Sequence, residues 1–168
     1  MIENGLKERF LELVNQHNAI IHKISKVYGE TLEDREDLFQ DILLNLWKGY
    51  PSFRGESKFS TWLYRIALNT CITGYRKKSK FPKTYSISDR HKVIPDTGNI
   101  PDNGEELRLL YRAIDKLDKL EKAIMILYLE EKSYEEIAEI VGITPNNTGV
   151  KITRIKEKLR KHFENENI

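Results

Sequence analysis

Apolar residues recur at helical spacing along most of the chain, and no segment alternates in the manner of a β-strand. In the N-terminal part the spacing predicts three helices, over 6–28, 31–48 and about 58–80, with an ordered turn at 49–57. Gly29 is expected to end the first of these helices. In the C-terminal part the spacing predicts helices over 105–117, 118–130 and 133–141 and a longer last helix. The pattern therefore predicts an all-α protein.

The segment 81–104 interrupts this pattern. It holds three of the five prolines, two glycines and scattered Asp, Ser and Asn, and it shows no helical period. We therefore expect two small helical domains, over 1–80 and 105–168, joined by a flexible linker over 81–104. Domains of this size bury little apolar surface alone, so an additional partner is expected.

The end of the chain has the features of a helix-turn-helix. Ser133 and Glu136 have the spacing of a capping box, and Gly142 can supply the positive φ of a tight turn. Thr144 then provides a hydroxyl cap ahead of Pro145 at the first position of the last helix. A short helix, a glycine turn and a longer basic helix together form the arrangement that places a recognition helix in the major groove.

Charge is divided into blocks along the chain, although the net charge is only +2. Acidic residues dominate 30–41, whereas basic residues dominate 76–83 and 151–161. Two separate basic blocks indicate two contacts with a polyanion, because clustered Lys and Arg neutralise phosphates. Solvated helix ends are the alternative interpretation for either block alone.

Several classes of protein and site are disfavoured by the composition. The single cysteine, Cys71, excludes an internal disulfide and every multi-cysteine metal site, which fits a reducing, cytoplasmic setting. The longest run without charged residues is eleven positions, 140–150, so we expect no membrane insertion. The four histidines lack ligand spacing and no catalytic motif occurs. We therefore expect no catalytic residue, no metal and no cofactor.

Two of the N-terminal helices carry faces suited to binding. In the helix over 58–80, aromatic and basic residues interleave around Trp62, as in platforms for unstacked bases. A tryptophan packed in the core is the alternative. In the helix over 31–48, seven of the ten residues 38–47 are apolar, and three helices bury only one side of such a helix. The apolar residues that the three helices leave exposed suit a protein partner with a basic surface, unless this chain covers the helix on all sides.

The last helix combines an apolar stripe with a basic one. Thr148, Ile152, Ile155 and Leu159 share one face, which we expect to dock on the preceding helices. A second stripe repeats the same spacing and is predicted to lie on the opposite face; it consists of Asn147, Lys151, Arg154 and Lys158, with Asn146 beside it. Asn can pair with adenine and Arg with guanine, so this stripe is expected to read DNA. A solvated helix in an ordinary bundle is the alternative.

The segments 34–47, 52–69 and 133–138 resemble bacterial RNA polymerase sigma factors of the extracytoplasmic-function type, and the resemblance covers almost all of the chain. It implies that the helix over 31–48 binds the largest subunits of core polymerase, through Asp37, Leu38, Gln40, Asp41, Leu44 and Trp47. It implies that the N-terminal domain recognises the minus-ten element and holds the melted nontemplate strand, through Phe53, Arg54, Lys58, Phe59, Trp62, Arg65, Asn69, Arg76 and Lys77.

The same resemblance implies that the C-terminal helix-turn-helix reads the minus-thirty-five element in duplex DNA. The expected contacts are Thr144, Asn146, Asn147, Lys151, Thr153, Arg154 and Lys158. Gly149 and Val150 depart from the family pattern, which often has a basic residue followed by a small polar one at these positions. An anti-sigma partner is expected from the family alone.

These observations favour a non-enzymatic promoter-specificity subunit that binds core polymerase and places two DNA-reading domains. An autonomous helix-turn-helix repressor or activator is the alternative, but it leaves the Trp62 stripe and the apolar helix over 31–48 without a role. A purely structural scaffold explains neither basic block.

Overall fold

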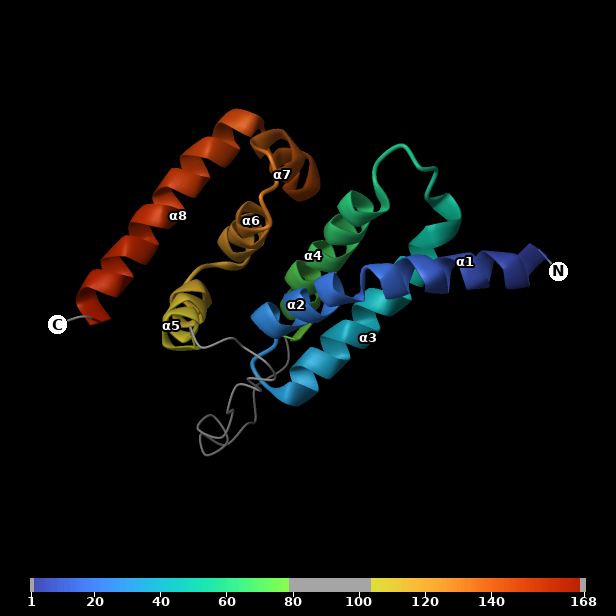
Figure 1. The fold of residues 1–168 in the computed structure, drawn as a ribbon, viewed down its shortest axis with the longest axis horizontal. Helices are drawn as coiled ribbons and strands as arrows, with labels where there is room; N and C mark the ends of the chain where they lie inside the picture. Colours follow the sequence, from blue (N-terminus) through green and yellow to red (C-terminus); the bar gives the residue numbers. More distant parts are fainter. Residues whose placement is uncertain (1, 79–103, 167–168) are drawn as a thin grey trace. The chain divides into compact units, whose positions relative to one another are not determined.

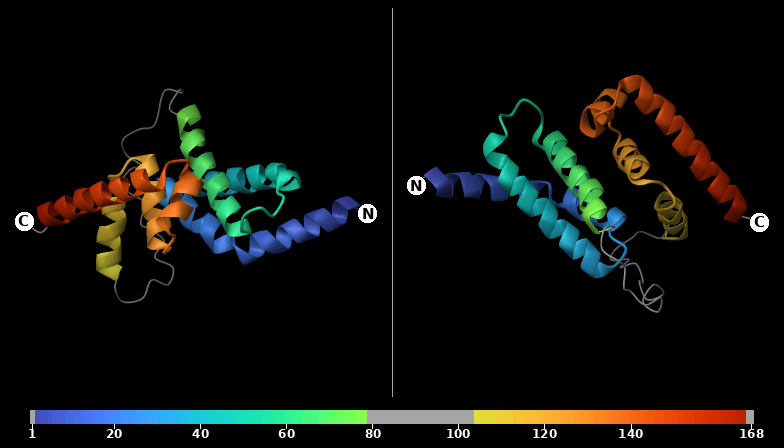
Figure 2. Two further views of the ribbon diagram at one scale, coloured as in Figure 1. Left: turned by 90° about the horizontal axis from the view of Figure 1, so that it is seen from above. Right: turned by 180° about the vertical axis from the view of Figure 1, so that it is seen from behind.

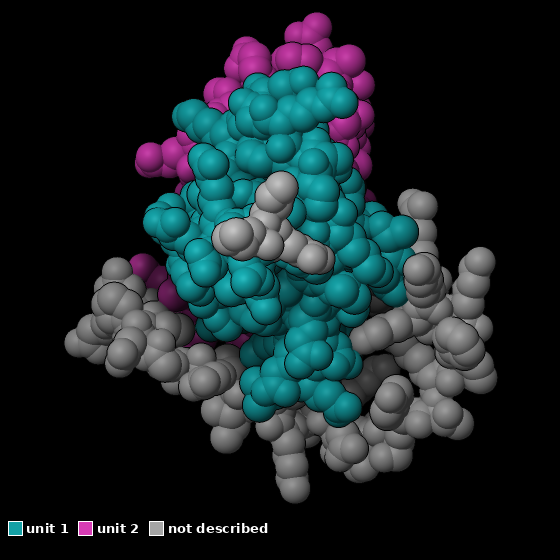
Figure 3. Space-filling model, turned by 90° about the vertical axis from the view of Figure 1, so that its right-hand side faces the viewer, with its two compact units in different colours: residues 1–84 teal, residues 85–168 magenta. Residues whose placement is uncertain are grey.

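The computed structural model describes residues 2–78 and 104–166, with side chains at 4–74 and 104–166. Every regular element in these residues is helical, which confirms the predicted all-α class (Figure 1). The chain divides into two compact units, 1–84 (unit 1) and 85–168 (unit 2), coloured separately in Figure 3. Among the described helices, none is long and apolar enough to span a bilayer. The expected linker 81–104 lies outside the described residues except for Gly104, which begins a helix.

Unit 1 is built on three helices that pack on one another, with a further helix before them and a short turn of 3-10 helix inside. Its elements are α1 (Ile2–Gln16), α2 (Asn18–Tyr28), α3 (Leu32–Gly49), η1 (Tyr50–Ser52) and α4 (Phe59–Lys78). α2, α3 and α4 contact each other and enclose the core, where Ile21, Ile42 and Leu63 are fully buried (Figure 1, Figure 2).

The single helix predicted over 6–28 is two helices, α1 and α2, which meet at His17. The ring Nδ1 of His17 donates a hydrogen bond to the carbonyl of Leu13 at 2.8 Å, while the backbone N–H of His17 donates to Val14. The side chain thus replaces the backbone donor that Leu13 would have in a continuous helix. Apolar spacing on both sides of His17 does not show this competition, and the prediction of one helix is therefore wrong.

The start of α3 and the end of α2 are set by local contacts. Thr31 and Asp34 form a capping box, with Thr31 Oγ1 accepting from the N–H of Asp34 at 3.0 Å. Gly29 ends α2 as predicted, but its φ of −88° is an ordinary extended value. Space is what requires glycine here, because a Cβ would lie 2.6 Å from Arg35 Cγ and 2.9 Å from the carbonyl oxygen of Ser25.

The described part of unit 2, residues 104–166, consists of four helices. They are α5 (Gly104–Asp115), α6 (Lys119–Leu129), α7 (Tyr134–Val141) and α8 (Pro145–Glu166). Ser133 and Glu136 form the predicted capping box at α7, and Gly142 has the left-handed φ of 77° that the tight turn needs. α7, this turn and α8 are the predicted helix-turn-helix.

The apolar stripe predicted along α8 is the side that packs. Thr148, Ile152, Ile155 and Leu159 are all buried, and α8 contacts α5, α6 and α7. α6 supplies the facing core with a run of five consecutive buried residues, 123–127, that includes Ile124. Unit 2 therefore presents α8 with one covered side and one open side.

Candidate functional site

An exposed stripe runs along α3 and combines acidic, amide and apolar side chains. Asp37, Gln40, Asp41 and Leu44 are all exposed, and their three- and four-residue spacing places them on one face. Leu44 is 50% exposed, so the stripe contains an apolar side chain that the packing of unit 1 leaves open. Among the residues of unit 1 that the structure describes, α3 is therefore not covered on all sides.

Leu38 and Trp47 lie at the two edges of this stripe and are half-buried. The ring of Trp47 is 5.0 Å from the ring of Phe10 on α1, and Phe10 is 5.2 Å from Tyr50. Trp47 is therefore held at the edge of the stripe by α1. All six residues expected to bind polymerase lie on or beside one surface of α3.

A cluster of four rings lies beneath the loop between η1 and α4. The ring centroid of Trp62 lies 5.0 Å from that of Phe53, 5.5 Å from that of Phe59 and 6.5 Å from that of Tyr50. Offset and tilted rings at these separations attract one another beyond their area of contact. The loop that arches between η1 and α4 in Figure 1 is thus anchored by a ring at each end, with Arg54 and Lys58 exposed between them.

Trp62 combines features of both interpretations of the sequence. Its side chain is half-buried in the ring cluster, so it is neither a fully buried core residue nor an isolated ring on an open stripe. Farther along α4, Arg65 is half-buried and Asn69 is exposed. The side chains of Arg76 and Lys77, which are expected DNA contacts, lie outside the described residues.

The polar side of α8 is arranged differently from the prediction. A helix turns by about 100° per residue, so the stripe Asn147, Lys151, Arg154 and Lys158 lies about a quarter turn from the buried stripe. Residues directly opposite the buried stripe are Asn146, Val150 and Glu157, all of them exposed. The prediction that the basic stripe occupies the opposite face is therefore wrong, because equal spacing fixes which residues share a face but not the angle between two faces.

Most residues expected at the minus-thirty-five element are accessible on α8 or at its start. Asn146, Asn147, Thr153 and Arg154 are exposed, whereas Lys151 is half-buried. Thr144 is exposed at the start of the helix, where its Oγ1 accepts from the N–H of Asn147 at 3.2 Å. This bond caps α8 in the way that the sequence predicts.

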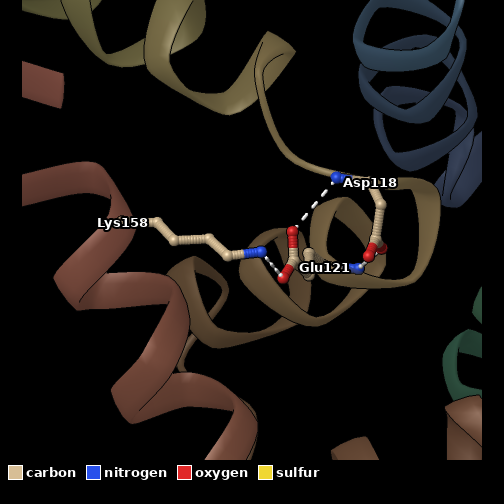
Figure 4. A network of polar contacts seen from close by, with 3 residues as sticks. All are labelled: Asp118, Glu121 and Lys158. Atoms are coloured by element: carbon tan, nitrogen blue, oxygen red, sulfur yellow. Dashed lines mark hydrogen bonds and ion pairs between the residues drawn. The ribbon is translucent and has the colours of Figure 1, made fainter.

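Lys158 forms an ion pair with a carboxylate of its own unit. Its ammonium group pairs with Glu121 on α6, and the second oxygen of Glu121 accepts from the N–H of Asp118 at 3.1 Å (Figure 4). The hydrogen bond from Lys158 to Glu121 raises the pKa of the lysine. The charge of Lys158 is thus paired with Glu121 before any DNA binds.

Other features of these surfaces were not predicted from the sequence. Phe10 and Tyr50 join the edge of the α3 stripe to the ring cluster. For Tyr50, the sequence signal was the group of aromatic residues between 50 and 59. Asn45 donates to Thr70 at 3.0 Å and links α3 to α4, a contact without a sequence signal. In the described part of the chain, no group of His, Cys, Asp and Glu side chains could hold a metal ion.

Comparison with known families gives two matches in one chain. The family described as Sigma-70 region 2 matches residues 13–81, and Sigma-70, region 4 matches residues 107–159. The first match contains the α3 stripe and the ring cluster, and the second contains α7, the turn and α8 as far as Leu159.

Individual relatives match over most of their length. The RNA polymerase sigma factor YlaC of Bacillus subtilis is 34% identical, with 79% of each chain covered. The ECF RNA polymerase sigma factor SigW of Bacillus subtilis is 28% identical, over 96% of this chain and 92% of the relative. The ECF RNA polymerase sigma-E factor of Escherichia coli is 29% identical, over 94% and 88% of the two chains.

Two solved structures share the fold. CnrH, solved in complex with the cytosolic domain of CnrY, has a TM-score of 0.67 at 21% identity, with 94% of this chain and 89% of that chain covered. The sigma factor RpoE of Bartonella quintana, solved with the anti-sigma factor NepR, has a TM-score of 0.69 at 21% identity, with 94% and 96% covered.

Proposed function

This chain belongs to the extracytoplasmic-function sigma factors of bacterial RNA polymerase, and from that premise we propose which of its surfaces meet polymerase and which meet DNA. It is a non-enzymatic subunit that binds RNA polymerase and promoter DNA and directs transcription initiation. We assign 1–80 to sigma region 2, 81–104 to the linker and 105–168 to sigma region 4.

The α3 stripe is proposed to bind the largest subunits of core polymerase. The observation that carries this assignment is Leu44, an exposed apolar side chain whose neighbours on the same face are Asp37 and Asp41. Apolar surface rimmed by one sign of charge is typical of a protein interface, in which burial supplies affinity and charge supplies orientation. Gln40, Leu38 and Trp47 would complete the contact.

The loop 53–58 and α4 are proposed to capture the minus-ten element after melting. Extruding a base costs a few kcal/mol of stacking and pairing, which stacking on aromatic rings and polar contacts can offset. The ring cluster of Phe53, Phe59 and Trp62 supports this role because it fixes both ends of an exposed loop that carries Arg54 and Lys58. Arg65, Asn69, Arg76 and Lys77 are proposed to track the strand along α4.

α8 is proposed to enter the major groove at the minus-thirty-five element. Its exposed N-terminal turns carry Asn146, Asn147 and Arg154, which are side chains that can pair with base edges. Thr144, Lys151, Thr153 and Lys158 are assigned to the same surface. On binding to DNA, the ammonium group of Lys158 would either leave Glu121 for a phosphate or contact both groups.

An anti-sigma protein is proposed as a further partner, because the sigma factor RpoE of Bartonella quintana was solved with one. Covering the α3 stripe would block polymerase binding and hold the chain inactive. Since the chain acts with RNA polymerase, we place it in the cytoplasm.

Transcription from fragmented genomic DNA tests the proposal. Purified core polymerase is supplied with and without this protein, and RNA starts are mapped. We expect new starts that share two spaced upstream motifs. No new starts, together with tight binding of duplex DNA by the protein alone, would replace the proposal by an autonomous helix-turn-helix regulator.

A further inference from the structure

The open side of α8 carries an apolar residue among polar ones. Val150 is 49% exposed and lies opposite the buried stripe of α8, one turn after Asn146. The core of unit 2 is formed by the other side of the helix, so Val150 has no part in it. A β-branched apolar side chain in this place also costs some helix propensity relative to alanine. The exposed side chain is therefore available for a contact outside unit 2.

Thr153 extends this apolar surface by one turn. Its hydroxyl donates to the carbonyl of Gly149 at 3.0 Å, so the hydroxyl is turned toward the helix backbone. The methyl group is then what the exposed Thr153 offers to a partner. Gly149 has no side chain of its own and lies beside the ring of Tyr134, where a Cβ would come within 3.4 Å. Val150 and Thr153 thus form a small apolar surface.

Charged and amide side chains surround this surface. Arg154 and Asn146 are exposed beside it, and Lys151 is half-buried next to Val150. A polyanion therefore suits the surroundings better than an apolar peptide does, because the cations would favour phosphate close to the apolar contact. The apolar group that DNA offers in its major groove is the 5-methyl of thymine, which distinguishes thymine from every other base there.

We infer that Val150, with the methyl of Thr153, recognises the 5-methyl group of a thymine in the upstream promoter element. This inference rests on the proposed placement of α8 in the major groove, and it adds a specificity-determining residue at a position where the sequence departs from the family pattern. A valine can distinguish thymine from cytosine there without a hydrogen bond.

Replacement of thymine by uracil tests the inference, since the two bases differ only by this methyl group. Holoenzyme made with the full chain first selects its upstream element from random duplex DNA, and the selected element is then synthesised with uracil in place of each thymine in turn. At one position we expect binding to weaken about fourfold, the factor associated with burying one methyl group. Val150→Ala should bring this ratio close to one and leave binding to the uracil DNA unchanged.

Leu129→Ala is the matched control, because Leu129 is also 49% exposed, in unit 2 but on α6. We expect this variant to keep the wild-type ratio of thymine to uracil binding. Circular dichroism and binding of core polymerase should be unchanged in both variants.

Three results would overturn the inference. They are a selected element without thymine, equal binding of thymine and uracil DNA by the wild-type holoenzyme at every position, and a Val150→Ala holoenzyme that keeps the wild-type ratio of thymine to uracil binding. The last of these would show that another residue senses the methyl group. Failure to select any sequence would instead contradict the proposed function, so the two failures are distinguishable.

Discussion

Two glycines of this chain are needed for different physical reasons. Gly142 supplies a positive φ of 77° at the turn of the helix-turn-helix, where residues with a Cβ are strained. Gly29 has an ordinary φ, but Arg35 and Ser25 occupy the space that a side chain would need. The sequence predicted the positive φ of Gly142 and the helix end at Gly29, whereas the close contacts that exclude a side chain at Gly29 are visible only in the structure.

Gly29→Ala is predicted to lower the free energy of unfolding by about 1–3 kcal/mol, the range for inserting a methyl group into a filled site. The added Cβ would be 2.9 Å from the backbone nitrogen of Arg35, which cannot move without disturbing the start of α3. Urea unfolding of the full chain measures the change. Gly5→Ala is the control: beyond the adjacent residues and the local backbone of α1, no atom lies within 4 Å of its Cβ position, so this variant should be neutral or slightly more stable.

Arg154→Ala is predicted to weaken promoter binding at the upstream element by about 1–3 kcal/mol if the arginine pairs with a base. The side chain is exposed on α8, so the fold should not change. Binding of holoenzyme to the selected element and to variants with single base changes provides the measurement. An equal loss on all sequences, with a smaller salt dependence, would make Arg154 a phosphate contact.

At the scale of helices, α1 has two side chains that are only 5% exposed, Phe10 and Val14, and Phe10 joins it to two other elements of unit 1. Phe10 is 5% exposed and contacts both Trp47 at the edge of the α3 stripe and Tyr50 in the ring cluster. Through these rings, α1 supports the proposed polymerase surface and the loop proposed to hold the minus-ten base.

Phe10→Ala is predicted to lower the free energy of unfolding by about 3–5 kcal/mol, because it removes a buried ring and leaves a cavity. Leu11→Ala is the neighbouring control, since Leu11 is exposed and should change stability by less than about 0.5 kcal/mol. Thermal and urea unfolding of the full chain give both values. Equal, small losses in the two variants would mean that α1 does not pack on unit 1 in solution.

At the scale of the whole molecule, binding of polymerase and capture of DNA are proposed to occupy separate surfaces. Within unit 1, the α3 stripe and Asn69 on α4 are both exposed. Variants on one surface should therefore leave the function of the other intact.

Asn69→Ala is predicted to slow promoter opening about tenfold, the effect of losing one hydrogen bond of about 1.4 kcal/mol. Binding to core polymerase should not change. Permanganate footprinting reports opening, and co-elution with core polymerase reports binding. Leu44→Asp is the reciprocal variant, which should weaken co-elution because it places a charge in an apolar interface. Loss of both functions in Asn69→Ala would contradict the separation of the two surfaces.

The sequence by itself determined the helical class, most helix limits, the helix-turn-helix and the buried stripe of α8. These features depend on signals that act within one or two turns, such as the capping pairs at Thr31 and Ser133 and the glycine at 142. The sequence also showed the family to which the chain belongs, because the motifs that the family shares are continuous in sequence.

The tertiary structure decided which helix faces remain open and how the side chains on them are held. The break at His17, the ring cluster around Trp62 and the pairing of Lys158 with Glu121 could not be predicted from periodicity. The last two of these join residues on different elements, and in Lys158 and Glu121 the partners are 37 positions apart. Spacing along one helix fixes which residues share a face, whereas packing by distant residues decides which faces are covered.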